Sequence, residues 1–168
     1  YRSIPLLEIL RTLIGREAPA LNLDGLWAFG KDFDIKKNLG KVVVICFRSY
    51  KSPRVYPTLK YLQRQYENYG EDAGPVIPVT VAYLKGMKDI EGQLNQVEEE
   101  LKELGITYPG GLDPTVKKEI FRSYQANVGS ASLIFVDPAG RIAYYEQDPM
   151  PNAFGLFSRV IERLLGGE

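Results

Sequence analysis

Apolar residues gather in three short unbroken runs that predict buried strands. The first run covers residues 42–47, the second residues 76–82 and the third residues 132–136. None of them alternates between apolar and polar positions, so we expect strands that are covered on both faces of a sheet. Pro78 stands inside the second run. Because proline has no amide N–H, it favours a bend or an edge-like register at that point.

Apolar residues at three- and four-residue steps predict helices between and around these runs. The expected helices cover residues 3–14, 53–69, 90–104, 114–124 and 152–165. Asp89 is expected to cap the third of them. Three consecutive glutamates, Glu98, Glu99 and Glu100, fall on that helix, and we interpret them as its solvated side rather than as a metal site.

Two hairpins complete the predicted fold. Residues 26–29 and 33–35 flank a turn at Gly30, which predicts an N-terminal hairpin extension. The tight turn at residues 137–140 leads from the third apolar run into an extended segment at residues 141–146. The element order β-α-β-α-α-β-β-α predicts an α/β fold, with a mixed central sheet and helices on both faces.

Composition and charge exclude several classes of protein. The 168 residues are 45% hydrophobic and 25% charged, as in a globular domain with a sizeable core. We expect one domain over residues 1–168, with an amphipathic helix in residues 1–14 and the core in residues 15–165. Lys plus Arg and Asp plus Glu number 21 each, so no basic field favours nucleic acid. No apolar run reaches the roughly 18–20 residues of an integral membrane segment.

The counts of cysteine and histidine narrow the candidate chemistry. The chain has one cysteine, Cys46, and no histidine. An internal disulfide, a Ser-His-Asp or Cys-His nucleophile and a His-ligated metal are therefore excluded. We expect neither a metal nor a cofactor. Cys46 lies inside the first apolar run, where burial raises the pKa of a thiol, so a structural role is favoured over a peroxidatic one.

Four stretches carry a resemblance that covers residues 15–165. They are GREAPA at 15–20, LGKVVV at 39–44, LKELGITYPGGLD at 101–113 and SLIFVDPAGRI at 132–142. In order and spacing they resemble the redoxin branch of the thioredoxin-like superfamily, which includes peroxiredoxin-type proteins and membrane-tethered thiol-disulfide oxidoreductases. The resemblance implies a thioredoxin-like three-layer fold. It also slightly favours an extracytoplasmic location.

The resemblance places an active site where the first central strand meets the next helix. Family members carry a Cys-x-x-Cys pair there, at a helix N-terminus whose amide N–H groups stabilise a thiolate. Two alignments put Ser52 on this site, one together with Ser49 and the other with Val55, and neither supplies a cysteine. A serine hydroxyl forms no disulfide and stays un-ionised at neutral pH, so we interpret both serines as helix-capping remnants.

A second departure from the family pattern agrees with the first. Oxidoreductases of this fold place a cis-proline just before the late strand, where this chain has Ala131. A cis peptide bond is far less favourable before a residue other than proline, so we expect it to be lost. Peroxiredoxin-like members instead place an arginine near their thiol, and residues 127–132 contain none.

Two hypotheses about function follow. The first is a thioredoxin-like domain without redox cysteines, a non-catalytic binding or structural module with a protein partner at the former active-site face. The residues expected at that face are Tyr50, Lys51, Pro53, Arg54, Ser130 and Ala131. The alternative is a thiol-disulfide oxidoreductase or peroxiredoxin-like antioxidant protein, which is either a Cys-to-Ser variant or uses Cys46.

Overall fold

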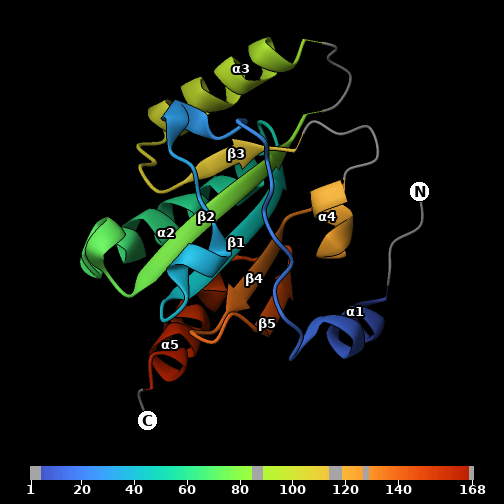
Figure 1. Cartoon of the computed structure of the whole chain (residues 1–168), viewed down its shortest axis with the longest axis vertical. Helices are drawn as coiled ribbons and strands as arrows, with labels where there is room; N and C mark the ends of the chain where they lie inside the picture. Colours follow the sequence, from blue (N-terminus) through green and yellow to red (C-terminus); the bar gives the residue numbers. More distant parts are fainter. Residues whose placement is uncertain (1–4, 85–88, 114–118, 127–128, 167–168) are drawn as a thin grey trace.

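The computed structural model describes residues 5–84, 89–113, 119–126 and 129–166, which form a five-stranded sheet with helices on both faces (Figure 1). The strands are β1 Val42–Ser49, β2 Val76–Tyr83, β3 Gly110–Leu112, β4 Ser132–Val136 and β5 Ile142–Gln147. Their order in the sheet is β3-β2-β1-β4-β5. The β1–β2 and β2–β3 pairs are parallel, and the β1–β4 and β4–β5 pairs are antiparallel. The predicted mixed α/β sheet is thus confirmed.

The helices are α1 Leu6–Leu13, α2 Tyr56–Asn68, α3 Ile90–Glu103, α4 Glu119–Ser123 and α5 Phe154–Leu164. Helices α2 and α5 share one face of the sheet, where the rings of Tyr61 and Phe154 stack 4.5 Å apart. Helix α4 lies on the other face and packs the Phe121 ring 5.0 Å from that of Phe47. Parts of two predicted helices, residues 3–4 and 114–118, lie outside the described residues.

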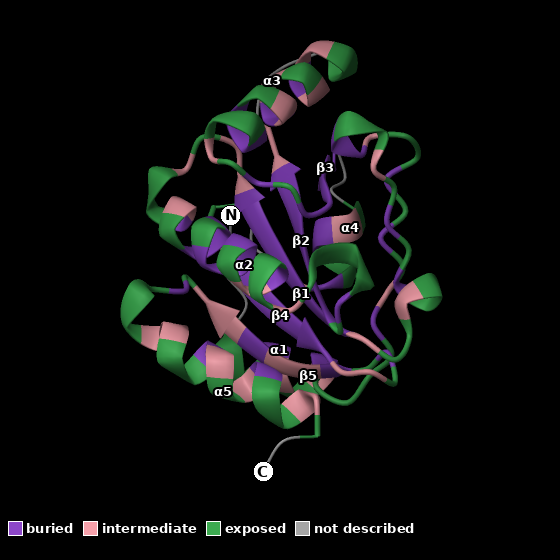
Figure 2. Ribbon diagram, turned by 90° about the vertical axis from the view of Figure 1, so that its left-hand side faces the viewer, coloured by how far each residue is buried: buried purple, intermediate pink, exposed green. Residues whose placement is uncertain are grey.

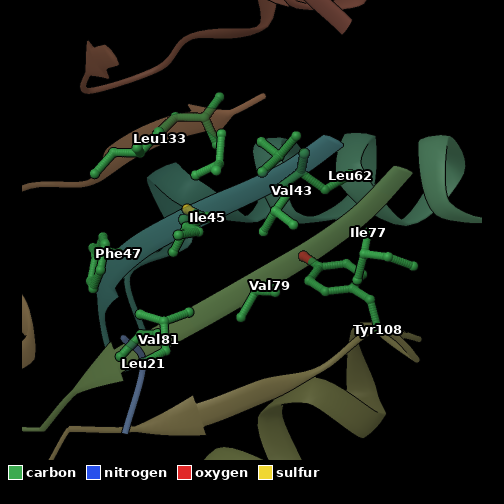
Figure 3. Close-up of a cluster of buried hydrophobic side chains, with 14 of the residues drawn as sticks. Leu21, Val43, Ile45, Phe47, Leu62, Ile77, Val79, Val81, Tyr108 and Leu133 are labelled. Carbon is green, nitrogen blue, oxygen red and sulfur yellow. The ribbon is translucent and has the colours of Figure 1, made fainter. Parts of the chain in front are cut away.

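The core is built around β1, as the unbroken apolar run predicts. Every residue from Val42 to Phe47 is at most 1% exposed, and Figure 2 shows the sheet buried between helices whose outer sides are exposed. Figure 3 shows alternate residues of β1, Ile45 and Phe47, beside residues of β2 such as Val79. A strand that is covered on both faces needs no polar side chains on either face. The lack of alternation in the sequence of β1 therefore agrees with its burial in the structure.

Pro78 lies at a position in β2 where the missing amide N–H removes no backbone hydrogen bond from the sheet. The Thr80 amide N–H donates to the carbonyl of Pro109 over 3.1 Å, so it points toward β3. Pro78 comes two residues earlier and its nitrogen therefore points to the same side. Strand β3 begins at Gly110, which pairs with Thr80, and does not extend as far as Pro78. The predicted edge-like register is confirmed.

The predicted N-terminal hairpin extension is wrong. Residues 26–29 and 33–35 form no strand pair; the 3₁₀ turns Ala28–Gly30 and Ile35–Asn38 occupy this part of the chain. The rings of Trp27 and Phe33 lie 6.1 Å apart and both are buried. A hairpin with one covered face and a loop that packs its rings against the core give the same local sequence pattern. In this protein the residues pack against the core and form no hairpin.

The segment before β1 instead covers both edges of the sheet. At the β3 edge, the Leu112 amide N–H donates to the carbonyl of Leu26 over 3.0 Å. At the β5 edge, Ile142 exchanges two backbone hydrogen bonds with Gly15 and Arg16, of 2.7 and 2.8 Å. Among the described residues, no helix combines the length and apolar character needed to cross a membrane.

Candidate functional site

The two serines of the predicted site lie at the end of β1 and at the start of the following helical segment. Ser49 is the last residue of β1. Ser52 takes the N-cap position of the 3₁₀ turn Pro53–Val55, which continues into α2, but its hydroxyl makes no capping hydrogen bond. Pro53 has no amide N–H to donate, and the Val55 N–H donates to the Ser52 carbonyl over 3.0 Å. The expected capping by the serine hydroxyl is therefore wrong for Ser52.

A small cavity of about 90 Å³ lies between the Ser52 turn and the loop that precedes β4. Four of the residues predicted from the family resemblance line it: Ser52, Arg54, Ser130 and Ala131. Residues 148–150, after β5, complete the lining. The other predicted face residues, Tyr50, Lys51 and Pro53, do not line this cavity. The fold thus brings together side chains from distant parts of the sequence.

Ala131 stands in the loop where redox members of the superfamily have their cis-proline. Every peptide bond of the described residues is trans, including the one between Ser130 and Ala131. The Ala131 carbonyl accepts a 2.8 Å hydrogen bond from the amide N–H of Asp148. The expected loss of the cis bond agrees with this geometry.

A buried ion pair lies beneath the loop that connects β1 to the Ser52 turn. Nη1 of Arg48 is 2.7 Å from Oε1 of Glu100 in α3, and both side chains are almost completely buried. Nε of Arg48 donates to Oγ1 of Thr80 over 3.1 Å, and this hydroxyl donates to the carbonyl of Cys46 over 3.0 Å. The interpretation of Glu98, Glu99 and Glu100 as one solvated face is therefore wrong for Glu100.

The other carboxylate oxygen of Glu100 holds the loop itself. Oε2 accepts hydrogen bonds of 2.8 Å from the amide N–H of Lys51 and from the hydroxyl of Tyr56. Lys51 has a φ of 51°, which is uncommon for a residue with a side chain. Its ammonium lies 5.7 Å from the centre of the Tyr50 ring, at the surface. One buried carboxylate therefore joins the end of β1, the loop and the start of α2.

The Tyr56 phenol responds to this environment. Burial, and then the hydrogen bond and the charge of Glu100, raise its pKa from the ordinary 10.0 to about 12. The neutral phenol is the form that donates to the carboxylate, so both causes favour the protonated state. At neutral pH the hydrogen bond from Tyr56 to Glu100 is therefore maintained.

Cys46 is buried, as its place in the apolar run predicts. Its side chain is fully inaccessible, and burial raises the pKa of the thiol to about 12 despite the opposing charge of Arg48. A thiol with that pKa has almost no reactive thiolate at neutral pH. Among the residues that the structure describes, no group of three or more Cys, Asp or Glu side chains could hold a metal ion.

Sequence reasoning missed Thr80 and Glu100 as parts of this region. Thr80 lies in an apolar strand, so it does not stand out in the sequence. Glu100 belongs to a run of three glutamates of which only the third turns toward the core. A signal does exist in hindsight: Arg48 ends an apolar strand run and, if buried, requires an anionic partner.

Comparisons with known proteins agree with the fold. The model of the AhpC/TSA family matches residues 14–145. No curated protein sequence matches the chain significantly. Similar solved structures include three bacterial proteins. A thiol:disulfide interchange protein of the thioredoxin family from Chlorobium tepidum shares 19% identity with a TM-score of 0.69, covering 89% of this chain and 96% of its own.

The second is a thiol-disulfide isomerase from Corynebacterium glutamicum, with 22% identity, a TM-score of 0.66 and coverage of 90% and 98% of the two chains. The third is the thioredoxin domain of a thiol-disulfide oxidoreductase from Bacteroides vulgatus, with 19% identity, a TM-score of 0.66 and coverage of 88% and 97%. At these identities the likeness concerns the fold, and it confirms the predicted thioredoxin-like architecture.

Proposed function

This chain belongs to the AhpC/TSA family of the thioredoxin-like redoxins, and from that premise we propose that it is a non-catalytic binding module. The observation that carries the proposal is the state of its thiols. Neither alignment with the family puts a cysteine at the two cysteine positions, and the one cysteine, Cys46, is buried with a pKa of about 12. Disulfide exchange needs an accessible thiolate and a second sulfur. This chain offers neither at its site.

The proposed binding face is the surface around the cavity at Ser52. The cavity has a volume of about 90 Å³, which suits a single side chain of a partner. Pockets for small-molecule ligands are usually larger, roughly 300–1,000 Å³. The cavity lining includes an exposed cation, Arg54, and an exposed carboxylate, Asp148, and the preceding loop adds the exposed cation Lys51. This mixture favours a protein segment that inserts one side chain and pairs its own charges with the rim.

One assay separates the binding module from an active thiol enzyme. Insulin reduction and peroxide consumption are measured for the wild type, for Cys46→Ser and for Ser49→Cys/Ser52→Cys. We expect no turnover from the wild type or Cys46→Ser, and insulin reduction from the double-cysteine variant. Wild-type turnover that disappears in Cys46→Ser would contradict the proposal and favour the alternative, a thiol oxidoreductase or antioxidant peroxidase that uses Cys46.

Binding is tested with peptides selected from a random displayed library on the wild-type protein. The affinity of a selected peptide is then measured by fluorescence anisotropy against Ser52→Tyr, which fills the cavity. Ser123→Tyr, on the exposed side of α4, serves as the matched control. We expect Ser52→Tyr to weaken binding about tenfold or more and Ser123→Tyr to leave it unchanged. Equal affinities for both variants would place the peptide elsewhere and contradict the proposed face.

A further inference from the structure

Glu100 is a buried charge whose two oxygens differ: Oε2 accepts two hydrogen bonds, whereas Oε1 makes only the ion pair with Arg48. Its two carboxylate oxygens contact a guanidinium, a phenol and a backbone amide, with Arg48 at 2.7 Å and Tyr56 and Lys51 at 2.8 Å each. A buried carboxylate is tolerated only when its charge is compensated and its lone pairs accept hydrogen bonds. The three partners come from β1, the following loop and α2, whereas Glu100 comes from α3.

This carboxylate supports the loop conformation together with a 2.8 Å hydrogen bond from the Tyr50 amide N–H to the Tyr83 carbonyl. Lys51 is held at a φ of 51° without being glycine, asparagine or aspartate, the residues that adopt such angles most readily. Its amide N–H donates to Glu100 over 2.8 Å, and the Glu100 side chain is almost completely buried. Without that acceptor, the amide would lose its partner and the strained backbone would lose its compensation.

The ion pair is in turn fixed from the sheet. Nε of Arg48 donates to Thr80 of β2, which limits the positions available to the guanidinium. Neither Nη1 nor Nη2 of Arg48 makes a hydrogen bond among the described atoms, and the anionic contact of the guanidinium within the described ion pairs is the 2.7 Å approach of Nη1 to Glu100. Arg48 therefore attracts Glu100 to one position, and Glu100 places the loop.

We infer that Glu100 is a positioning residue that fixes the Tyr50–Lys51 loop and couples helix α3 to the face around Ser52. The loop is then held in its observed shape in the free protein, and loss of the Glu100 carboxylate releases it. The significance of this coupling for binding rests on the proposed function. The coupling itself is a property of the free protein and is tested without a partner.

The test measures the loop directly in the free protein. Hydrogen exchange of the Lys51 amide is compared between the wild type, Glu100→Gln and Glu99→Gln, which makes the same charge change at the exposed neighbouring position. In a second readout, Ser52→Cys is labelled with 5,5′-dithiobis(2-nitrobenzoate) with and without Glu100→Gln. The wild type is the blank, because Cys46 is buried.

We expect Glu100→Gln to accelerate exchange of the Lys51 amide about tenfold or more, and to change the Ser52→Cys labelling rate at least about threefold, with Glu99→Gln like the wild type. Unchanged Lys51 exchange in folded Glu100→Gln overturns the inference.

If Glu100→Gln does not fold, two further variants test the inference. Tyr56→Phe removes one partner and keeps the ion pair, and it should accelerate Lys51 exchange to a smaller extent.

The second variant, Arg48→Met/Glu100→Met, separates positioning from stability. Apolar side chains of similar volume replace the pair, so the fold is retained while the acceptor for Lys51 is lost. Rapid exchange at Lys51 in this stable variant supports the inference, and slow exchange overturns it. If peptide selection at the face fails while Lys51 exchange responds as expected, the proposed function fails and the coupling stands.

Discussion

The carboxylate of Glu100 and the guanidinium of Arg48 lie 2.7 Å apart in the interior, although one belongs to α3 and the other to the central strand. Such a pair contributes little net stability, because removing both charges from water costs about as much as their attraction returns. Breaking it is different, since the remaining charge stays buried without compensation. Removing one charge should therefore lower the free energy of unfolding much more than removing both, and this difference can be measured.

Glu100→Ala should therefore lower the free energy of unfolding by about 3–5 kcal/mol. The double variant Arg48→Met/Glu100→Leu should stay within about 2 kcal/mol of the wild type, since it leaves no buried charge behind. Urea unfolding followed by circular dichroism measures both. Glu99→Ala, at an exposed position of the same helix, is the control and should change little. A double variant as unstable as Glu100→Ala would argue against this account.

Stability should also fall at alkaline pH through Tyr56. The pKa of this phenol is about 12 in the folded protein and near 10.0 in an unfolded chain, so the folded state holds its proton more tightly. Its contribution is complete below pH 10 and is lost as the pH rises from 10 toward 12. Urea midpoints measured at pH 8 and pH 11 should drop more for the wild type than for Tyr56→Phe. Parallel pH profiles would show that Tyr56 has no part in this loss.

Two glycines should respond in opposite directions to alanine. At Gly111 in β3, a Cβ would lie 2.3 Å from a methyl carbon of Leu23 and 3.0 Å from the Leu26 carbonyl oxygen. Gly111→Ala should therefore cost about 1–3 kcal/mol through overpacking. At Gly155 in α5, the nearest atom is 4.0 Å away on the flexible Arg159 side chain. Gly155→Ala should stabilise by about 0.5–1 kcal/mol, and thermal unfolding measures both.

Cys46 should react with thiol reagents only when the protein unfolds. With a pKa of about 12, roughly one thiol in ten thousand is ionised at pH 8, and the side chain is inaccessible. Labelling by 5,5′-dithiobis(2-nitrobenzoate) should be very slow in buffer and fast in denaturing urea. Rapid native-state labelling would mean that the strand opens and that Cys46 is available for chemistry.

The sequence predicts the fold much better than the site. The runs at residues 42–47 and 76–82 are buried parallel strands, because a strand covered on both faces leaves an unmistakable pattern. The position of Ser52 beside Ala131 follows from the family resemblance. The role of Glu100 does not follow from either source, since the same run of glutamates is compatible with a fully solvated helix face. Which of them is buried depends on Arg48, a residue distant in sequence whose burial no local pattern shows.

The segment from Gly15 to Trp27 pairs with part of each border of the sheet. An open strand border presents unpaired amides and carbonyls, to which a second chain can add a strand. Here the backbone near Leu26 covers β3, and Gly15 and Arg16 cover the start of β5. The segment before the predicted hairpin thus shortens the open sheet border to which a neighbouring copy could add a strand.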